Sequence, residues 1–300
     1  MNLSARDQKF IWHPLTQHKT HPKMMGISRA DGVYLYDEEG NSYIDGISSW
    51  YTAVYGHCNP AITEPVYHQM KQLDQVVFSG FTHEPAVALS EKLVPLLPGN
   101  QAKIFFSDNG STSVEVAIKM AMQYHFNRGQ KKDVLLAFEE GFHGDTFGAM
   151  SVSGLSVYNG PFEDFSLEVQ RIPTPKTRDA TEIIAHLEKL LRTNRIAAFV
   201  YEPLVQGAAA MKLHDPEGLD HILEYLKSRG VLLIADEVMT GFRSKFGGAQ
   251  ELLGIEADIT CLGKVIGGGF PVGAYGAREE IMQMVAPLGQ MYQAGTLSGN

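Results

Sequence analysis

The sequence contains few of the residues that mark an extracellular, membrane or nucleic-acid-binding protein. Among its 300 residues are only two cysteines, Cys58 and Cys261, which are far apart and form no CxxC motif, so neither a disulfide framework nor a structural zinc site is expected. Lys and Arg form no cluster, and the formal net charge of −9 argues against a nucleic-acid surface. No segment approaches the roughly 18 apolar residues of a membrane span, and the N-terminus has no signal-like apolar core. These absences favour a soluble, cytoplasmic protein without a metal ion.

The chain does contain a repeated order of strand, turn and helix. Helical patterns separate short apolar runs at 103–107, 134–138, 197–201, 231–235 and 259–262. Continuous apolar strands of this kind are typical of a parallel sheet that helices cover on both faces. The sequence therefore predicts an α/β fold.

The first residues follow a different pattern. Residues 32–48, GVYLYDEEGNSYIDGIS, alternate between apolar and polar around a DEEGN turn, which predicts a β-hairpin. We expect a small N-terminal α+β segment that ends near residue 55.

Each predicted strand of the larger part ends in polar or glycine-rich sequence. The five segments are SDNGS, EEGFHGD, EPLVQG, DEVMTG and GKVIGGG. Ligands of open parallel sheets bind beyond the carboxyl ends of the strands, so these segments are expected to converge on one site.

Three of these segments carry residues suited to one cofactor. Asp236 ends a buried strand, where a carboxylate needs a helix N-terminus, an ion pair or a bound cation as its partner. Lys264 lies among glycines, either as a solvated surface lysine or as an amine that can form an imine with an aldehyde. Gly110 and Ser111 begin a predicted helix, whose amides and dipole favour a phosphate. No GxxxxGK[ST] or correctly placed GxGxxG motif occurs, which argues against ordinary nucleotide loops and a nicotinamide dehydrogenase.

A phosphate seat, an imine-forming lysine and a buried aspartate together indicate pyridoxal 5′-phosphate. Asp236 would pair with the pyridinium nitrogen. Val238, two residues further along an extended segment, would lie against one face of the ring, while Glu237 points away. Phe142 could stack on the other face or belong to the core. His143 and Asp145 are interpreted as residues that cap or orient their loop.

The order NGS, GFHGD, EP, DEVMTGF, GK and GTLSGN resembles class III, fold-type I aminotransferases over nearly the whole chain. Residues 1–235, which include IWHPLTQHKT, GFTHEPA and EPLVQGAAAM, are similar to the 7,8-diaminopelargonate synthases (adenosylmethionine-8-amino-7-oxononanoate aminotransferases). Residues 236–300, from DEVMTGFR to GTLSGN, are similar to the glutamate-1-semialdehyde 2,1-aminomutases. The synthases have Tyr where Phe142 stands and often where Leu15 stands.

This resemblance implies a mostly parallel, seven-stranded type of sheet with flanking helices and a role for each matching residue. Lys264 would hold the cofactor covalently, and Asp236 would contact its ring nitrogen. The resemblance further implies a homodimer, in which Thr296 reaches the cofactor phosphate of the neighbouring subunit. The remaining matches are the cofactor contacts Gly110, Ser111, Phe142 and Val238 and the substrate-pocket positions Trp50, Tyr51 and Gly295.

The predicted activity is PLP-dependent amino transfer to 8-amino-7-oxononanoate in biotin biosynthesis, with S-adenosylmethionine as donor. One alternative is the aminomutase reaction of tetrapyrrole biosynthesis. Another is a truncated or chimeric protein that binds PLP without turnover. Residues 1–55 would be the N-terminal part of a small domain and residues 56–300 the large PLP-binding domain. The C-terminal small domain of these families is expected to be absent.

Overall fold

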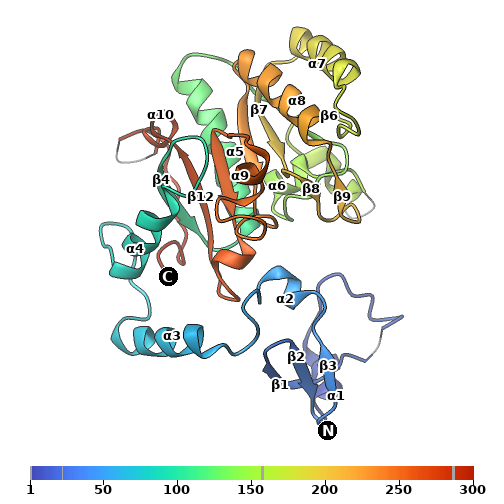
Figure 1. Ribbon diagram of the computed structural model, residues 1–300, viewed down its shortest axis with the longest axis vertical. Coiled ribbons are helices and arrows are strands. Elements are labelled where there is room, and N and C mark those ends of the chain that lie inside the picture. Colours follow the sequence, from blue (N-terminus) through green and yellow to red (C-terminus); the bar gives the residue numbers. More distant parts are fainter. Residues whose placement is uncertain (1, 22, 157–158, 286–287) are drawn as a thin grey trace. The chain divides into compact units, whose positions relative to one another are not determined.

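The structure, a computed structural model, describes residues 2–21, 23–156, 159–285 and 288–300. It divides into two compact units, Met1–Asp74 and Gln75–Asn300 (Figure 1). The division falls after helix α3 (Pro60–Gln72), later than the boundary expected near residue 55. Because α3 buries none of its side chains, its sequence gives little indication of the unit to which it belongs.

The first unit contains the predicted hairpin. Strands β2 and β3 pair antiparallel, with Tyr34 opposite Ile44, and β1 adds to β2 to complete a three-stranded sheet. Asp37 holds the turn because its Oδ1 accepts hydrogen bonds from the amides of Glu39 at 2.9 Å and Asn41 at 2.8 Å. The described elements are α1 (Leu3–Phe10), β1 (Ile27–Asp31), β2 (Tyr34–Asp37), β3 (Ser42–Ile44), α2 (Ser48–Tyr51) and α3.

The second unit is an α/β structure around a seven-stranded sheet of order β4-β12-β11-β10-β7-β5-β6. Strands β11, β10, β7, β5 and β6 run parallel, whereas β12 is antiparallel to both of its neighbours. Its helices are α4 (Glu84–Leu93), α5 (Gly110–Asn127), α6 (Phe147–Val152), η1 (Gly160–Phe165), α7 (Thr181–Thr193), α8 (Pro216–Ser228), α9 (Gly248–Leu253), η2 (Lys264–Ile266) and α10 (Glu279–Met282). Its strands are β4 (Gln101–Ser107), β5 (Val134–Phe138), β6 (Val169–Ile172), β7 (Ile196–Tyr201), β8 (Val205–Gln206), β9 (Lys212–Leu213), β10 (Leu232–Asp236), β11 (Ile259–Leu262) and β12 (Gly273–Arg278).

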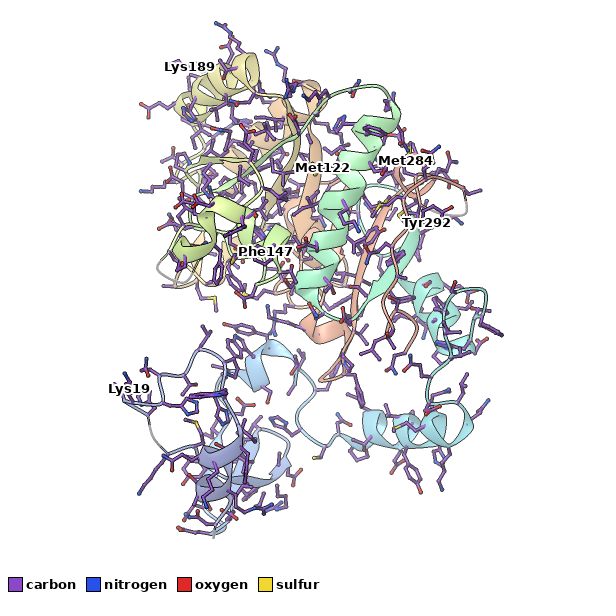
Figure 2. All side chains as sticks on the ribbon, turned by 180° about the vertical axis from the view of Figure 1, so that it is seen from behind. Lys19, Met122, Phe147, Lys189, Met284 and Tyr292 are labelled. Carbon is purple, nitrogen blue, oxygen red and sulfur yellow. The ribbon has the colours of Figure 1, made fainter. Side chains whose placement is uncertain are left out.

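Helices cover both faces of this sheet, which explains the continuous apolar strands (Figure 1). In β5, Leu135 packs in a cluster with α5 and α6, and the next residue, Leu136, packs with α7 and α8 on the opposite face. Met122 of α5 and Met284 lie at the edge of the first cluster (Figure 2). The predicted α/β fold is confirmed.

Helix α5 links this core to the site. Its stripe of Val114, Ala117, Ile118 and Ala121 is buried at 2% exposure or less, so the helix is held firmly on the sheet. Asn109 caps its first turn, with the Thr112 amide donating to Asn109 Oδ1 at 3.0 Å and the Asn109 amide donating to Thr112 Oγ1 at 3.2 Å. The start of α5 therefore has a defined position at the end of β4.

Candidate active site

The five polar segments meet at the carboxyl ends of the strands, as predicted. Asp236 closes β10 and pairs in register with Cys261 of β11, after which Gly263 and Lys264 follow. The loops after β4, β5 and β7 contribute the helix start at Gly110, the segment around His143 and Glu202. Side-chain contacts join all of these loops, as described below.

The charged centre of the site is a pair formed by Asp236 and His143. His143 Nδ1 lies 2.7 Å from Asp236 Oδ2, and both side chains are almost completely buried. Asp236 Oδ1 accepts a second hydrogen bond, from the Val238 amide at 3.0 Å. Burial lowers the pKa of His143, but the hydrogen bond to Asp236 and the charges of Asp236 and Glu202 outweigh it, so its pKa lies above the usual 6.5. The sequence interpretation had given His143 only a loop-orienting role.

Glu237 has a different role from Asp236, as the alternation of an extended chain predicts. Its carboxylate accepts hydrogen bonds from the amides of Ala249 at 3.0 Å and Gln250 at 2.8 Å, and from the Thr240 hydroxyl. Burial raises the pKa of Glu237, and these donors oppose the increase. Glu237 therefore tethers the segment after β10 to the start of α9.

Lys264 occupies a strained and partly buried position. Its φ of 48° lies in the left-handed region, which is uncommon for a residue with a side chain and is found most often at functional sites. Burial lowers the pKa of its ammonium group, the charges of Asp236 and Glu202 raise it, and that of Arg243 lowers it, with a net decrease. A lysine with a lowered pKa is a better nucleophile near neutral pH.

Two glycines and a valine make a close-packed floor beside this lysine. A Cβ at Gly263 would lie 2.9 Å from Gly110 Cα and 3.0 Å from Val238 Cγ1, and a Cβ at Gly110 would lie 2.6 Å from the same methyl group. No larger residue fits at either position without displacing its neighbours. The absence of side chains therefore lets the Gly110 and Gly263 backbones pack directly against Val238.

The N-terminus of α5 contacts the loop that follows β5. Ser111 Oγ lies 2.9 Å from Thr146 Oγ1 and accepts a hydrogen bond from the Thr146 amide at 3.1 Å. Gly144 is required next to this contact, because its φ is +128° and a Cβ there would lie 2.2 Å from Ser111 Oγ. The first amides of a helix lack intrahelical acceptors, so those of Gly110 and Ser111 can bind a phosphate.

Phe142 and Glu202 extend the site toward β7. The Phe142 amide donates to Glu202 Oε2 at 3.1 Å and the Gly207 amide to Glu202 Oε1 at 3.0 Å. Burial raises the pKa of Glu202, an increase that the charge of His143 opposes. Phe142 itself is 44% exposed, so its ring is available to a ligand. Glu202 was quoted as part of a strand-end segment but not predicted as a site residue.

Four residues predicted from the resemblance are not among the residues that the contacts above connect. Trp50 and Tyr51 belong to the first unit, where α2 has left-handed backbone angles that include φ values of 60° and 74° for these two residues. Asp45 supports that turn by accepting from the Ser49 amide at 2.7 Å. Gly295 and Thr296 are exposed near the end of the second unit, and Thr296 O accepts from Gln75 Nε2 at 2.6 Å. Their roles stay predictions.

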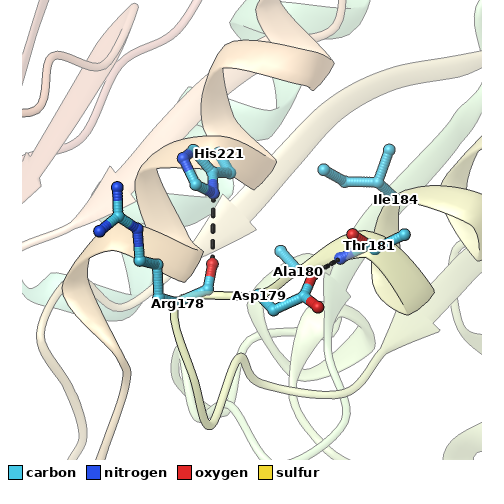
Figure 3. Close-up of a pocket in the computed structure, with 6 residues that line it drawn as sticks. All are labelled: Arg178, Asp179, Ala180, Thr181, Ile184 and His221. Carbon is cyan, nitrogen blue, oxygen red and sulfur yellow. Dashed lines mark hydrogen bonds between the residues drawn. The ribbon is translucent and has the colours of Figure 1, made fainter.

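A separate pocket of about 330 Å³ contains none of the predicted site residues (Figure 3). His221 Nδ1 lies 3.2 Å from the Arg178 carbonyl oxygen, and the Thr181 amide donates to Asp179 Oδ1 at 2.9 Å. The Arg178 guanidinium pairs with Glu217 at 2.6 Å, so its charge is already compensated. This pocket has no arrangement of groups that suggests chemistry.

The described residues contain neither a cluster of metal ligands nor a membrane-spanning helix. Across the ranges that the structure describes, no three His, Cys, Asp or Glu side chains are grouped so that they could hold a metal ion. Within the same ranges, no helix is long and apolar enough to cross a membrane.

The residues at the strand ends fit pyridoxal phosphate. Among the residues that the structure describes, each Asp236 oxygen has one hydrogen-bond donor, which leaves lone pairs for a protonated ring nitrogen. Gly110 and Val238 are only partly buried, so they can contact a planar ring, and the start of α5 offers amides to a phosphate. The fold and this site together describe a PLP-type transferase.

Residues 15–300 match the family described as aminotransferase class-III, and the chain belongs to that family. It is 42% identical over 269 residues to the adenosylmethionine-8-amino-7-oxononanoate aminotransferase of Synechococcus elongatus. That match covers 87% of this chain and 63% of the relative, so the chain spans less than two thirds of the relative's length.

Solved structures show the same relationship. The chain superposes on the adenosylmethionine-8-amino-7-oxononanoate aminotransferase of Methanocaldococcus jannaschii with a TM-score of 0.92 and 33% identity, covering 99% of this chain and 71% of that one. A PLP-bound amine transaminase from an uncultivated Pseudomonas species gives a TM-score of 0.85 at 30% identity, over 97% of this chain and 71% of the other. With 99% of the chain covered by the first of these, the shared fold extends through the segment 236–300.

Proposed function

We propose that this chain acts as a PLP-dependent aminotransferase that transfers an amino group to 8-amino-7-oxononanoate in biotin biosynthesis, with S-adenosylmethionine as the donor. The observation that carries the proposal is the arrangement of Asp236, His143 and Lys264 on a glycine floor, in a chain 42% identical to an enzyme of that name. The two unpaired cysteines agree with action in the cytoplasm.

Each site residue has a part in holding the cofactor. Asp236 would face the ring nitrogen, Val238 and Phe142 the two faces of the ring, and the amides of Gly110 and Ser111 the phosphate. Bound PLP supplies a protonated ring that withdraws electrons from the carbon bearing the amine. The buried Asp236 carboxylate, supported by His143, keeps a negative charge opposite that ring nitrogen.

Lys264 would be the covalent attachment point and the proton carrier. Once freed, its Nζ would act as general base at the amine-bearing carbon of the donor and as general acid at the cofactor carbon in the first half of the reaction, and it would move a proton in the opposite direction, to the acceptor carbon, in the second half. The lowered pKa of Lys264 favours the neutral amine that this step requires. Tight packing at Gly263 fixes the start of η2, so the lysine backbone cannot move far from the floor.

A homodimer would complete the site. The first amides of α5 provide only part of a phosphate seat, and Thr296, exposed in this chain, would supply a hydroxyl to the cofactor of the partner subunit. Trp50, Tyr51 and Gly295 would line the substrate pocket of the assembled enzyme.

A paired assay tests the proposed function. Purified chain loaded with PLP is incubated with 8-amino-7-oxononanoate and either S-adenosylmethionine or lysine as donor, and separately with glutamate-1-semialdehyde. We expect diaminopelargonate in the first assay and no aminolevulinate in the second. Lys264→Ala serves as the inactive control. Product only from the semialdehyde would establish the aminomutase reaction, and cofactor binding without either product would identify a non-catalytic binder.

A further inference from the structure

Three polar atoms beside the Asp236–His143 pair have no hydrogen-bond partner within the described residues. They are His143 Nε2 and the two polar side-chain atoms of Gln206, Nε2 and Oε1. Gln206 and the side chain of His143 are each 0% exposed, so bulk water does not reach them. Buried polar atoms are nearly always paired, and a group of unpaired ones in one place therefore requires a physical explanation.

The two side chains face the same small space next to Gly141. A Cβ built at Gly141 would lie 3.0 Å from His143 Nε2 and 3.7 Å from Gln206 Nε2. Both nitrogens thus lie within 4 Å of one point. No hydrogen bond joins the two side chains in the structure, so the bond inferred below requires a rotation of the Gln206 side chain that brings Oε1 toward His143 Nε2. The space exists because Gly141 has no side chain.

The backbone holds Gln206 in this orientation. Gln206 pairs with Lys212 in the β8–β9 hairpin, and the next residue, Gly207, donates its amide to Glu202 Oε1 at 3.0 Å. The Gln206 backbone is thus held on both sides, and its side-chain amide group is buried beside the strand ends. No pattern in the sequence distinguishes this residue within EPLVQG.

The charges around His143 determine which end of the amide is favoured. Asp236 contacts Nδ1 from β10, and the Glu202 carboxylate acts from the end of β7. Lys264 interacts with both carboxylates from η2, and Ser153 Oγ accepts from the His143 amide at 2.9 Å. Two nearby carboxylates favour a protonated ring, whose Nε2–H then needs an acceptor.

We propose that Gln206 is a positioning residue of this site: its Oε1 accepts a hydrogen bond from His143 Nε2–H and so keeps the imidazole protonated against Asp236. The importance of this bond for the reaction rests on the proposed function, because Asp236 would hold the ring nitrogen of the cofactor. The bond itself is a property of the chain without cofactor, and it can be measured there.

The test follows the titration of His143 by ¹⁵N NMR in cofactor-free protein labelled at histidine, with a His143→Gln sample to assign the resonance. Gln206→Leu removes the acceptor and should lower the pKa of His143 by about one pH unit, whereas Gln206→Glu should raise it. Gly141→Ala places a methyl group in the shared space and should lower the pKa in the same way as Gln206→Leu, with both polar side chains retained.

Gln250→Leu is the matched control. Gln250 is also 0% exposed, but it bonds Thr260 Oγ1 at 3.1 Å and the Ala257 amide at 3.0 Å. Its replacement should destabilise the fold and leave the His143 titration unchanged. If Gln206→Leu does not fold, Gln206→Glu and Gly141→Ala decide the question, because their expected shifts have opposite signs.

The cofactor-loaded protein gives the second readout. The pH dependence of the cofactor's visible absorbance should shift in the same direction as the His143 titration in each variant. An unchanged His143 titration in the folded Gln206 and Gly141 variants would overturn the hydrogen bond. A shifted titration with unchanged cofactor absorbance would overturn the positioning role. Failure of the paired turnover assay leaves the NMR result untouched, so the two failures are distinguishable.

Discussion

Replacing Asp236 with asparagine removes the charge at the centre of the site and keeps the shape of the side chain. The asparagine oxygen can still accept from the Val238 amide, which lies 3.0 Å from Asp236 Oδ1. The amide nitrogen would then face His143 Nδ1, now 2.7 Å from Oδ2, and because it is only a donor it cannot accept a hydrogen bond from a protonated ring. Asp236→Asn therefore removes the charge-assisted hydrogen bond with His143 selectively.

The structure indicates how large the effect should be. Breaking a buried ion pair costs about 3–5 kcal/mol when the remaining charge stays uncompensated. His143 can release its proton, which limits the loss in the free energy of unfolding to the value of one charge-assisted hydrogen bond, about 1.5–3 kcal/mol. Turnover should fall on the order of 10²–10³-fold, as it does when a preorganised electrostatic group is removed from an active site.

The stability loss should depend on pH. The folded pKa of His143 lies above the usual 6.5, so the pair contributes its full stability below about pH 6.5 and loses it as the pH rises through the folded pKa. Urea denaturation of cofactor-free protein at about pH 6 and about pH 9 should therefore show a larger gap between wild type and Asp236→Asn at the lower pH.

Two results would refute this reasoning. A stability gap that does not change with pH would show that His143 is not protonated against Asp236. Near-normal turnover of Asp236→Asn, with cofactor bound, would show that the carboxylate is only structural. His143→Gln is the matched control, since the double variant should lose little more stability than Asp236→Asn alone if the two side chains act as one pair.

Three further predictions concern the cofactor and the assembly. Borohydride reduction of the PLP-loaded chain followed by peptide mapping should place the pyridoxyl group on Lys264, and label on another lysine would contradict the assignment. Gly263→Ala should destabilise the chain by about 1–3 kcal/mol and weaken PLP binding, because the new Cβ would overlap Gly110 and Val238; unchanged denaturation and absorbance titrations would count against the close-packed floor. Active protein should sediment as a homodimer. Thr296→Ala should weaken PLP binding while the protein remains a dimer, whereas an active monomer would rule out the shared site.

The sequence by itself determined the elements whose signals are local. The runs 134–138 and 259–262 are strands with those same bounds, because a strand buried on both faces is composed mainly of apolar residues. The hairpin around the DEEGN turn was equally readable, since Asp37 and the residues two and four positions later make the turn among themselves. Placing Asp236 and Lys264 at strand ends required only the order of strands and glycines along the chain.

Tertiary structure alone decided which of these groups touch and what charge they carry. The hydrogen bond between His143 and Asp236 joins residues 93 positions apart, and the bond from the Phe142 amide to Glu202 joins residues 60 positions apart. No sequence periodicity links either pair. The space at Gly141 that Gln206 and His143 share depends on how the loops after β5 and β7 pack. Electrostatics follows distance and burial rather than sequence position. The sequence could therefore identify the Asp236 carboxylate and Lys264 as site residues, but only the packed fold identifies the His143 imidazole that contacts this carboxylate.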